Sequence, residues 1–381
     1  MANFSNEVRS VETAASRLFE STIDFPDEQF AQVIQAICGL LTVQNSSESP
    51  SVQPQAKVPL KPGQGHHRRV LSFSNQTVTD TNQELLFALA KLGEIASINS
   101  ERLLTSDPDK SGWDLLVAQL GATLDSTTMS TPVRIRAAEV LARFMLESGS
   151  IAAGLSEDLR GSIQLRLLEG LRDSLTALRG KKREDSVAGN ATDLEIHRVI
   201  LEGLRQILEN YGESLVEGWD VAFDIIGSVF VTTDTIPEDK RDSSKAVGTR
   251  SSKLVRSAFG SLQLICSDFL ASLPNGCFLI LVDALYNFSS QDDDLNIALT
   301  TVTFFWMLSD FLSGRSKSLE ITEELMKGVG STSLVNLAEN SEDKNSSAAL
   351  WLLLLQRLTA RHGLCVPNLS CLDFCHHFRR N

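Results

Sequence analysis

Residues 254–312 contain three consecutive helical patterns, and this stretch constrains the fold more than any other part of the sequence. The apolar positions of the first pattern are Leu254, Ala258, Leu262, Ile265 and Phe269. Those of the second are Phe278, Leu281, Val282, Leu285 and Phe288. Those of the third are Ile297, Thr301, Phe304, Phe305, Leu308 and Leu312. Steps of three or four residues place such side chains on one face of a helix, so the stretch predicts three amphipathic helices packed side by side.

Two short turns separate these helices. Leu273-Pro274-Asn275-Gly276 is expected to end the first helix, and the acidic turn Gln291-Asp292-Asp293-Asp294 leads into the third. Carboxylates at a helix start accept hydrogen bonds from free backbone N–H groups and lie at the positive end of the helix dipole. The acidic turn therefore predicts the beginning of the third helix.

Composition favours a protein made of small repeated helical units. The 381 residues are 42% hydrophobic but only 6% aromatic, and their spacing is helical throughout. This combination predicts an all-α fold, an armadillo- or HEAT-like α-solenoid of stacked antiparallel helices. The net charge of −13 disfavours nucleic acid and anionic membrane surfaces as direct ligands, because both attract clustered positive charge. Proteins are the expected partners.

The cysteines and the apolar runs indicate a cytosolic protein. Six cysteines are sparse for this length, and Cys266 and Cys277 stand in apolar helical stretches, which favours reduced thiols. The N-terminal residues are polar and lack the apolar core of a signal peptide. The longest apolar run, Ala348–Leu355, is much shorter than the roughly 20 residues that a membrane helix needs.

Four regions follow from the distribution of apolar and polar residues. Residues 1–43 form a helical segment with a turn at Phe25-Pro26-Asp27. Residues 44–80, rich in proline, serine and glutamine, are predicted to be a disordered linker, with helices resuming at about Asn82. Residues 81–364 are assigned to solenoid repeats with polar loops near 179–192 and 233–250, and residues 365–381 to an irregular tail. Within the repeats Thr131-Pro132 predicts an N-cap followed by a proline at the first helical position.

Four phrases of the sequence resemble a known family. They are ELLFALAKLGEIASINSERLL (84–104), ILEGLRQILENYGESLVEGWDVAFDII (200–226), SAFGSLQLICSDFL and DLNIALTTVTFFWMLSDFL. They resemble the repeats downstream of the catalytic domain in large Golgi Arf exchange factors, and most of all those of the Mon-two family. The resemblance extends over about residues 84–360, and the order of the four phrases matters more than any single phrase.

The resemblance implies a function. The Mon-two family would make the chain part of a non-catalytic scaffold for vesicle-mediated protein transport between the trans-Golgi network and endosomes. It implies peripheral, indirect attachment to the cytosolic face of those membranes. The implied partners are a Dopey-type scaffold and its associated lipid flippase, with Arf-family GTPases as further candidates, and no cofactor is implied. The phrases indicate the middle repeats of the family, without its N-terminal dimerisation region or its C-terminal part.

Two other functions remain open. The chain could be a regulatory fragment of an active Arf guanine nucleotide exchange factor, which an exchange domain in the complete reading frame would decide. It could also be an importin-like nuclear-transport solenoid, for which Ran-dependent cargo binding would be diagnostic. Catalysis is not expected, because the sequence contains no phosphate-binding loop, zinc-protease motif or nucleophile elbow.

Three features are candidates for a functional site. Ser72 follows a basic sequence, His66-His67-Arg68-Arg69, and is a possible phosphorylation site or simply part of a solvated basic spot. The tail contains Cys365, Cys371, Cys375, His376 and His377, but it lacks the paired spacings of a structural zinc site, so no metal is expected.

The third feature is a set of polar or aromatic residues inside the strongest helices. They are Asp268, Asn296, Trp306 and Asp310. They could form a polar seam or partner surface. Alternatively, the aspartates cap or tie helix ends, Asn296 bonds to backbone and Trp306 packs between layers.

Overall fold

The computed structural model describes residues 10, 13, 14, 17–42, 74–179, 187–231, 248–274 and 276–314. Within these residues the chain is built of stacked helices, so the predicted all-α solenoid class is confirmed. The helices group into two compact units, one up to Phe144 and the other from Met145 onward. The boundary lies inside helix α7 (Thr131–Ala153). None of the described helices has an apolar stretch long enough to cross a bilayer.

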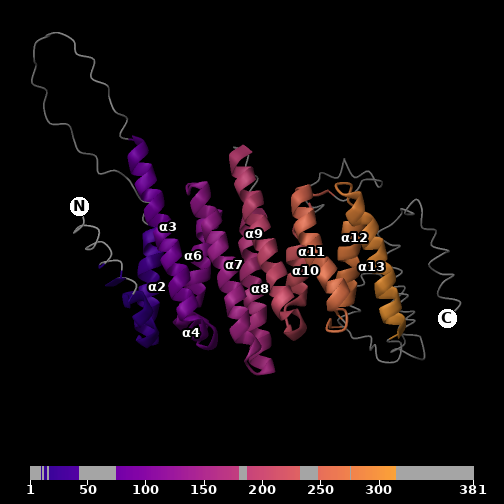
Figure 1. Ribbon diagram of the computed structural model, residues 1–381, viewed down its shortest axis with the longest axis horizontal. Coiled ribbons are helices and arrows are strands. Elements are labelled where there is room, and N and C mark those ends of the chain that lie inside the picture. Colours follow the sequence, from indigo (N-terminus) through magenta and orange to yellow (C-terminus); the bar gives the residue numbers. More distant parts are fainter. Residues whose placement is uncertain are drawn as a thin grey trace, which may run out of the picture. The chain divides into compact units, whose positions relative to one another are not determined.

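In the first unit helix α2 lies beside α3 (Figure 1). The elements of this unit are η1 (Ser21–Asp24), α2 (Asp27–Thr42), α3 (Ser74–Ile98), α4 (Ser100–Thr105), α5 (Pro108–Ser111), α6 (Trp113–Asp125) and the first part of α7. Helix α2 packs against α3, α5 and α6. Phe30 and Ile34 of α2 are fully buried, as their helical spacing predicts. Trp113 contacts Phe144 with ring centroids 5.3 Å apart, which joins the start of α6 to α7.

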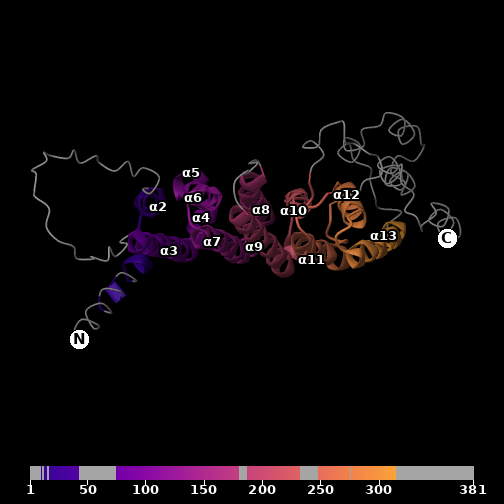
Figure 2. The same ribbon diagram turned by 90° about the horizontal axis from the view of Figure 1, so that it is seen from above.

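The second unit consists of helices in two rows (Figure 2). Its elements are the remainder of α7, α8 (Glu157–Arg179), α9 (Val187–Tyr211), η3 (Gly212–Ser214), α10 (Trp219–Gly227), α11 (Ser252–Asp268), α12 (Cys277–Ser289) and α13 (Leu295–Gly314). In one row α10 contacts α8 and α12, and in the other α11 contacts α9 and α13. Contacts between α8 and α9, α10 and α11, and α12 and α13 join the rows. This is the stacking of helix pairs that defines an α-solenoid.

A chain of aromatic contacts forms the core of the second unit near its last helices. Phe288 of α12 lies edge-on to Phe230, with ring centroids 4.9 Å apart, and 5.7 Å from Phe259 of α11. Phe259 in turn lies 5.9 Å from Phe304 of α13. Phe230 follows α10 and pairs with Thr249 in an isolated antiparallel bridge. The aromatic chain therefore connects residues of three helices and the segment after α10.

Gly218 positions α10 against α8. Its φ of +93° is left-handed, a conformation that glycine adopts without a steric penalty. A Cβ atom at this position would lie 2.7 Å from Leu168 Cδ1, which is too close for van der Waals contact. Glycine thus permits both the backbone turn and the close approach of the two helices.

The buried cysteines agree with the expectation of reduced thiols. Cys38, Cys266 and Cys277 are free and buried. Burial raises the pKa of the Cys38 thiol to about 11 and that of Cys266 to about 12. Both groups are therefore protonated and weakly nucleophilic at neutral pH.

Three helix starts differ from the sequence-based boundaries. Helix α3 begins at Ser74, inside the range predicted as linker, because residues 66–92 contain no proline or glycine that would stop it. Helix α9 begins at Val187, inside the loop predicted near 179–192, and Thr192 is already buried there. Helix α7 begins at Thr131, because the Ser130 carbonyl accepts the first helical hydrogen bond, from the Arg134 N–H.

Phe288→Ala should strongly destabilise the second unit. The ring is 0% exposed, and its removal would leave a cavity among Phe230 and Phe259. Deletion of a buried phenylalanine ring costs about 3–5 kcal/mol, so we expect a loss of this size in the free energy of unfolding, measured by urea denaturation with circular dichroism. Leu194→Ala is the control, because Leu194 is 37% exposed in the same unit. It should change stability by less than about 1 kcal/mol, and an equal effect of both changes would contradict the assigned core.

Candidate functional site

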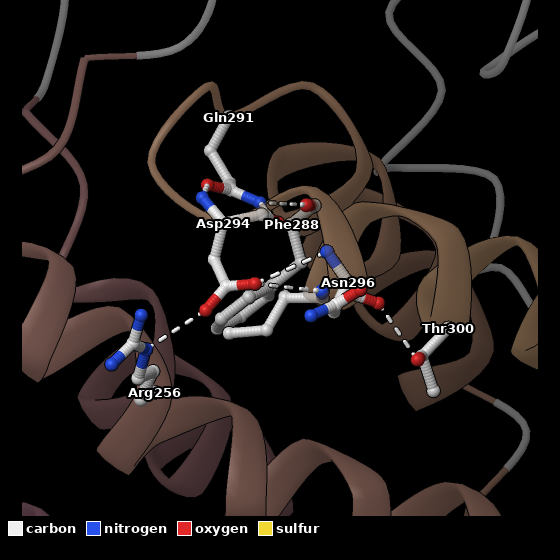
Figure 3. A network of polar contacts seen from close by, with 7 residues as sticks. Arg256, Phe288, Gln291, Asp294, Asn296 and Thr300 are labelled. Carbon is white, nitrogen blue, oxygen red and sulfur yellow. Dashed lines mark hydrogen bonds and ion pairs between the residues drawn. The ribbon is translucent and has the colours of Figure 1, made fainter.

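A connected polar cluster forms the turn between α12 and α13 and ties it to α11 (Figure 3). Arg256 of α11 donates from Nε to Asp294 Oδ2 at 2.8 Å. The other carboxylate oxygen, Oδ1, accepts the backbone N–H groups of Asn296 at 3.1 Å and Ile297 at 3.4 Å. Asp294 therefore caps the first turn of α13, as predicted for the acidic turn.

Gln291 holds the backbone of the same turn. The residue is 3% exposed, and its side chain points into the turn (Figure 3). The amide Nε2 donates to the carbonyls of Phe288 at 3.2 Å and Asp294 at 2.8 Å, and Oε1 accepts the Asp294 N–H at 2.8 Å. Because donors and acceptor are all used, this buried amide fixes the conformation of the turn.

The charges of this cluster favour ionised Asp294. The hydrogen bond from Arg256 lowers the pKa of the Asp294 carboxyl; desolvation acts against it, and the N–H groups of Ile297 and Asn296 lower it further. Thr249 donates its hydroxyl hydrogen to the neighbouring Asp293. The turn is thus attached to α11 through Arg256 and to the segment before α11 through Thr249.

The four residues of the predicted polar seam lie on two helices that contact each other, α11 and α13. Asp268 is the exposed last residue of α11. Asn296 lies exposed beside Asp294, which pairs with Arg256. A separation of twelve residues along α11 between Arg256 and Asp268 corresponds to about 18 Å of helix. Asp268 therefore lies at the other end of α11 from the contact with the start of α13, and a polar seam formed by the four residues stays a prediction.

Asn296, Trp306 and Asp310 do share one side of α13. At 100° per residue these three positions fall within about 80° of one another. Asn296 and Asp310 are exposed and Trp306 is half-buried. The residue that caps the start of α13 is Asp294. Asn296 donates its backbone N–H to Asp294, and its carbonyl accepts the Thr300 hydroxyl. A role of this side in partner binding stays a prediction.

Two other candidates lie outside the described residues. Ser72 is one of them. The other is the tail cluster of Cys365, Cys371, Cys375, His376 and His377. Among the described ranges, no group of three or more histidine, cysteine, aspartate or glutamate side chains is placed to hold a metal ion.

A histidine and a serine approach each other between α9 and the end of α10. His197 Nε2 lies 2.7 Å from Ser228 Oγ, and Ser228 donates its hydroxyl hydrogen to the Ile225 carbonyl at 2.6 Å. His197 Nε2 is accordingly the donor to Ser228. Both side chains are buried, so a substrate in solvent has no access to the hydroxyl. The pair ties α9 to α10.

The solvent side of α9 carries paired charges. Arg198 contacts Glu195 at 2.7 Å, and Arg205 contacts Glu202 at 3.3 Å and Glu209 at 2.8 Å. The hydrogen bond that Arg198 donates to Glu195 lowers the pKa of Glu195, and the hydrogen bond that Arg205 donates to Glu202 raises the pKa of Arg205. Exposed pairs at this spacing stabilise a helix only slightly, so the row is a solvated helix face.

Sequence reasoning did not identify Arg256, Gln291 or His197 as structural residues. Arg256 and Asp294 are far apart in the chain, so no local sequence pattern predicts their contact. Gln291 stood within the predicted acidic turn, but its burial could not be anticipated from a polar residue among aspartates. His197 lies on the apolar side of α9, between Ile196 and Ile200, and this periodicity could have predicted its burial.

Comparison with known proteins gives one consistent result. A sequence model described as "C-terminal region of Mon2 protein" matches residues 267–366, where the phrases had implied middle repeats of the family. The chain is 28% identical to the MON2 homolog of Schizosaccharomyces pombe over 278 residues, 73% of the chain and 16% of that protein. It is 25% identical to MON2 of Saccharomyces cerevisiae over 377 residues, 93% of the chain and 22% of that protein.

The similarity extends to animals. The human MON2 homolog is 25% identical over 308 residues, which cover 80% of the chain and 14% of the human protein. The chain therefore spans less than a quarter of the length of these relatives. No solved structure matches it.

Asp294→Asn should reveal the ion pair with Arg256 through its pH dependence. Asparagine also caps helices well, so the variant keeps the cap and loses the charge. The folded pKa of Asp294 lies below its ordinary value of 3.8, so the stabilisation is fully present above that pH and is lost as pH falls through the folded pKa. We expect the urea midpoint of the variant to lie below that of the natural chain from pH 7 to about pH 5, and the gap to shrink below about pH 4.

Arg256→Gln supplies the matched background for this measurement. Once Arg256 is neutral, replacement of Asp294 by asparagine removes no ion pair. The midpoint gap should then nearly vanish at all pH values. A gap that is equally large with and without the arginine would show that Asp294 acts through the helix cap alone.

Proposed function

Since the chain belongs to the Mon2 family, we propose that it is a scaffold segment that acts without catalysis in vesicle-mediated protein transport between the trans-Golgi network and endosomes. The observation that carries the proposal is the extent of the similarity. Relatives from two yeasts and from human align with 73–93% of the chain, a larger share than either stacked-helix unit makes up by itself.

The architecture supports a binding role. Stacked helix pairs expose long, regular surfaces on which a partner can bind without a deep pocket. The paired charges of α9 and the exposed side of α13 are surfaces of this kind. The histidine and serine that approach each other are both buried, and the serine hydroxyl donates to a backbone carbonyl. The described residues therefore suit protein binding better than covalent catalysis.

The partners and the location that we propose come from the family resemblance. The partners are a Dopey-type scaffold and, through it, a lipid flippase, with Arf-family GTPases as further candidates. The chain would act at the cytosolic face of trans-Golgi and endosomal membranes. A net charge of −13 is unfavourable for direct contact with anionic lipid, so attachment through these proteins suits it better.

Asn296 and Asp310 mark the side of α13 that we assign to partner contact. Both are exposed and lie within about 40° of each other on the helix. Asp310 is an exposed carboxylate on the last turns of α13, so a basic partner surface is the favoured complement. Asp268 at the end of α11 is an exposed acidic residue on the neighbouring helix.

Affinity purification of the tagged chain from its own cells, followed by mass spectrometry, tests the proposed function. We expect a Dopey-type scaffold and Golgi or endosomal sorting proteins to be recovered. Phe288→Ala should abolish recovery because it disrupts the core beneath α11, α12 and α13. The double change Asp268→Lys/Asp310→Lys should reduce recovery at least about tenfold without unfolding the chain, since exposed charges contribute little to stability.

Glu84→Lys/Glu101→Lys is the matched double charge reversal in the first unit. Both glutamates are exposed, in α3 and α4, and their replacement should leave recovery unchanged. Recovery of an Arf GTPase with nucleotide-exchange activity would overturn the scaffold proposal in favour of an exchange-factor fragment. Ran together with nuclear cargo would overturn it in favour of a transport receptor. Absence of any specific partner would show that this chain does not carry the scaffold function by itself.

A further inference from the structure

Helix α13 is apolar on two opposite sides. The side that faces the unit interior is buried and consists of Ile297, Thr301, Phe304 and Leu308. On the other side Leu295 is 72% exposed and Leu299 is 59% exposed. The apolar positions of this outer side continue through Val302 to Trp306, both half-buried. We call Leu295, Leu299, Val302 and Trp306 the outer stripe.

The spacing of the outer stripe is that of a helix–helix contact. Its residues follow one another at steps of four, three and four, which places them within about 60° on the helix. They lie roughly opposite the buried side, so no rotation of α13 could bury both at once. Helices that are apolar on both sides are normally covered on both sides. The exposed leucines of the outer stripe, Leu295 and Leu299, therefore require a further packing partner.

The sequence offers such a partner a short distance downstream. Asn345, Ser346 and Ser347 are good helix-capping residues, and eight apolar residues follow at Ala348–Leu355. A helix over this run would have no polar side, so it must also be buried. The family match at 267–366 includes both α13 and this run in one continuous region.

The connection between the two is long enough. About 30 residues separate Gly314 from Asn345, and such a chain can extend to roughly 100 Å. Helix α13 has 20 residues and is about 30 Å long, so the downstream run can reach either end of it. The entropy cost of closing a loop of this length rises only slowly with its length.

We propose that the segment 345–360 of this chain packs as a helix along the outer stripe of α13 and adds one more layer to the stacked helices. The segment is favoured over a second copy of the chain because a covalent connection of about 30 residues gives it a high effective concentration, up to about the millimolar range. Two copies that each carry a net charge of −13 also repel one another. The inference does not depend on the proposed transport function.

Hydrogen–deuterium exchange of the full chain, followed by mass spectrometry of peptides from residues 345–360, tests the proposal. In the natural chain these amides should exchange at least about tenfold more slowly than unstructured amides. Leu295→Asp/Leu299→Asp should remove this protection, because it places two charges in the stripe. Both leucines are exposed and lie away from the contacts of α13 with α11 and α12, so peptides of those helices should remain protected.

Thr300→Asp/Thr303→Asp is the matched control. Both threonines are exposed on α13 outside the stripe, and the double change adds the same charge to the same helix. Protection of residues 345–360 should survive it. Leu353→Asp is the reciprocal change and should remove protection of the segment while leaving α13 folded.

Three results would overturn the proposal. One is an unprotected segment in the natural chain. Another is protection that persists in both Leu295→Asp/Leu299→Asp and Leu353→Asp, or that is lost equally in the threonine control. The third is protection that appears only as the chain concentration rises and a dimer forms in sedimentation velocity, which would assign the outer stripe to a second copy.

Discussion

The burial of Phe288 is the contact on which the last helix pairs of the second unit depend. Its ring contacts Phe230 and Phe259, and Phe259 in turn contacts Phe304 of α13. Such aromatic pairs add specific geometry to a large burial of apolar area. Because each ring comes from a different segment, the aromatic chain fixes where α11, α12 and α13 lie relative to one another.

The polar turn before α13 adds directional hydrogen bonds to the apolar packing of the aromatic core. Apolar packing alone tolerates small rotations of a helix, whereas hydrogen bonds have directional preferences. Gln291 fixes the turn through hydrogen bonds to its backbone, and Asp294 joins the first turn of α13 to Arg256 of α11. The same bonds determine which side of α13 faces outward. The exposure of Leu295 and Leu299 is therefore a consequence of a well-anchored helix start.

The sequence was most informative where local periodicity decides the structure. All five apolar positions predicted for the second pattern are buried in α12, and the acidic turn caps α13. Helix starts were less accurate because polar residues such as those at 74–80 join a helix when no proline or glycine stops them. Contacts such as that between Arg256 and Asp294 could not be predicted, since they depend on how distant helices pack. For the same reason the polar seam across α11 and α13 stays a prediction.

The two apolar sides of α13 have a consequence for where partners can bind. If the segment 345–360 covers the outer stripe, Trp306 becomes part of an internal contact. Asn296 and Asp310 then lie at the rim of that contact and stay open to solvent. Rim residues of this kind suit polar recognition, because they need not be desolvated fully when a partner binds. The added helix would thus turn an aggregation-prone apolar side into a bounded polar surface.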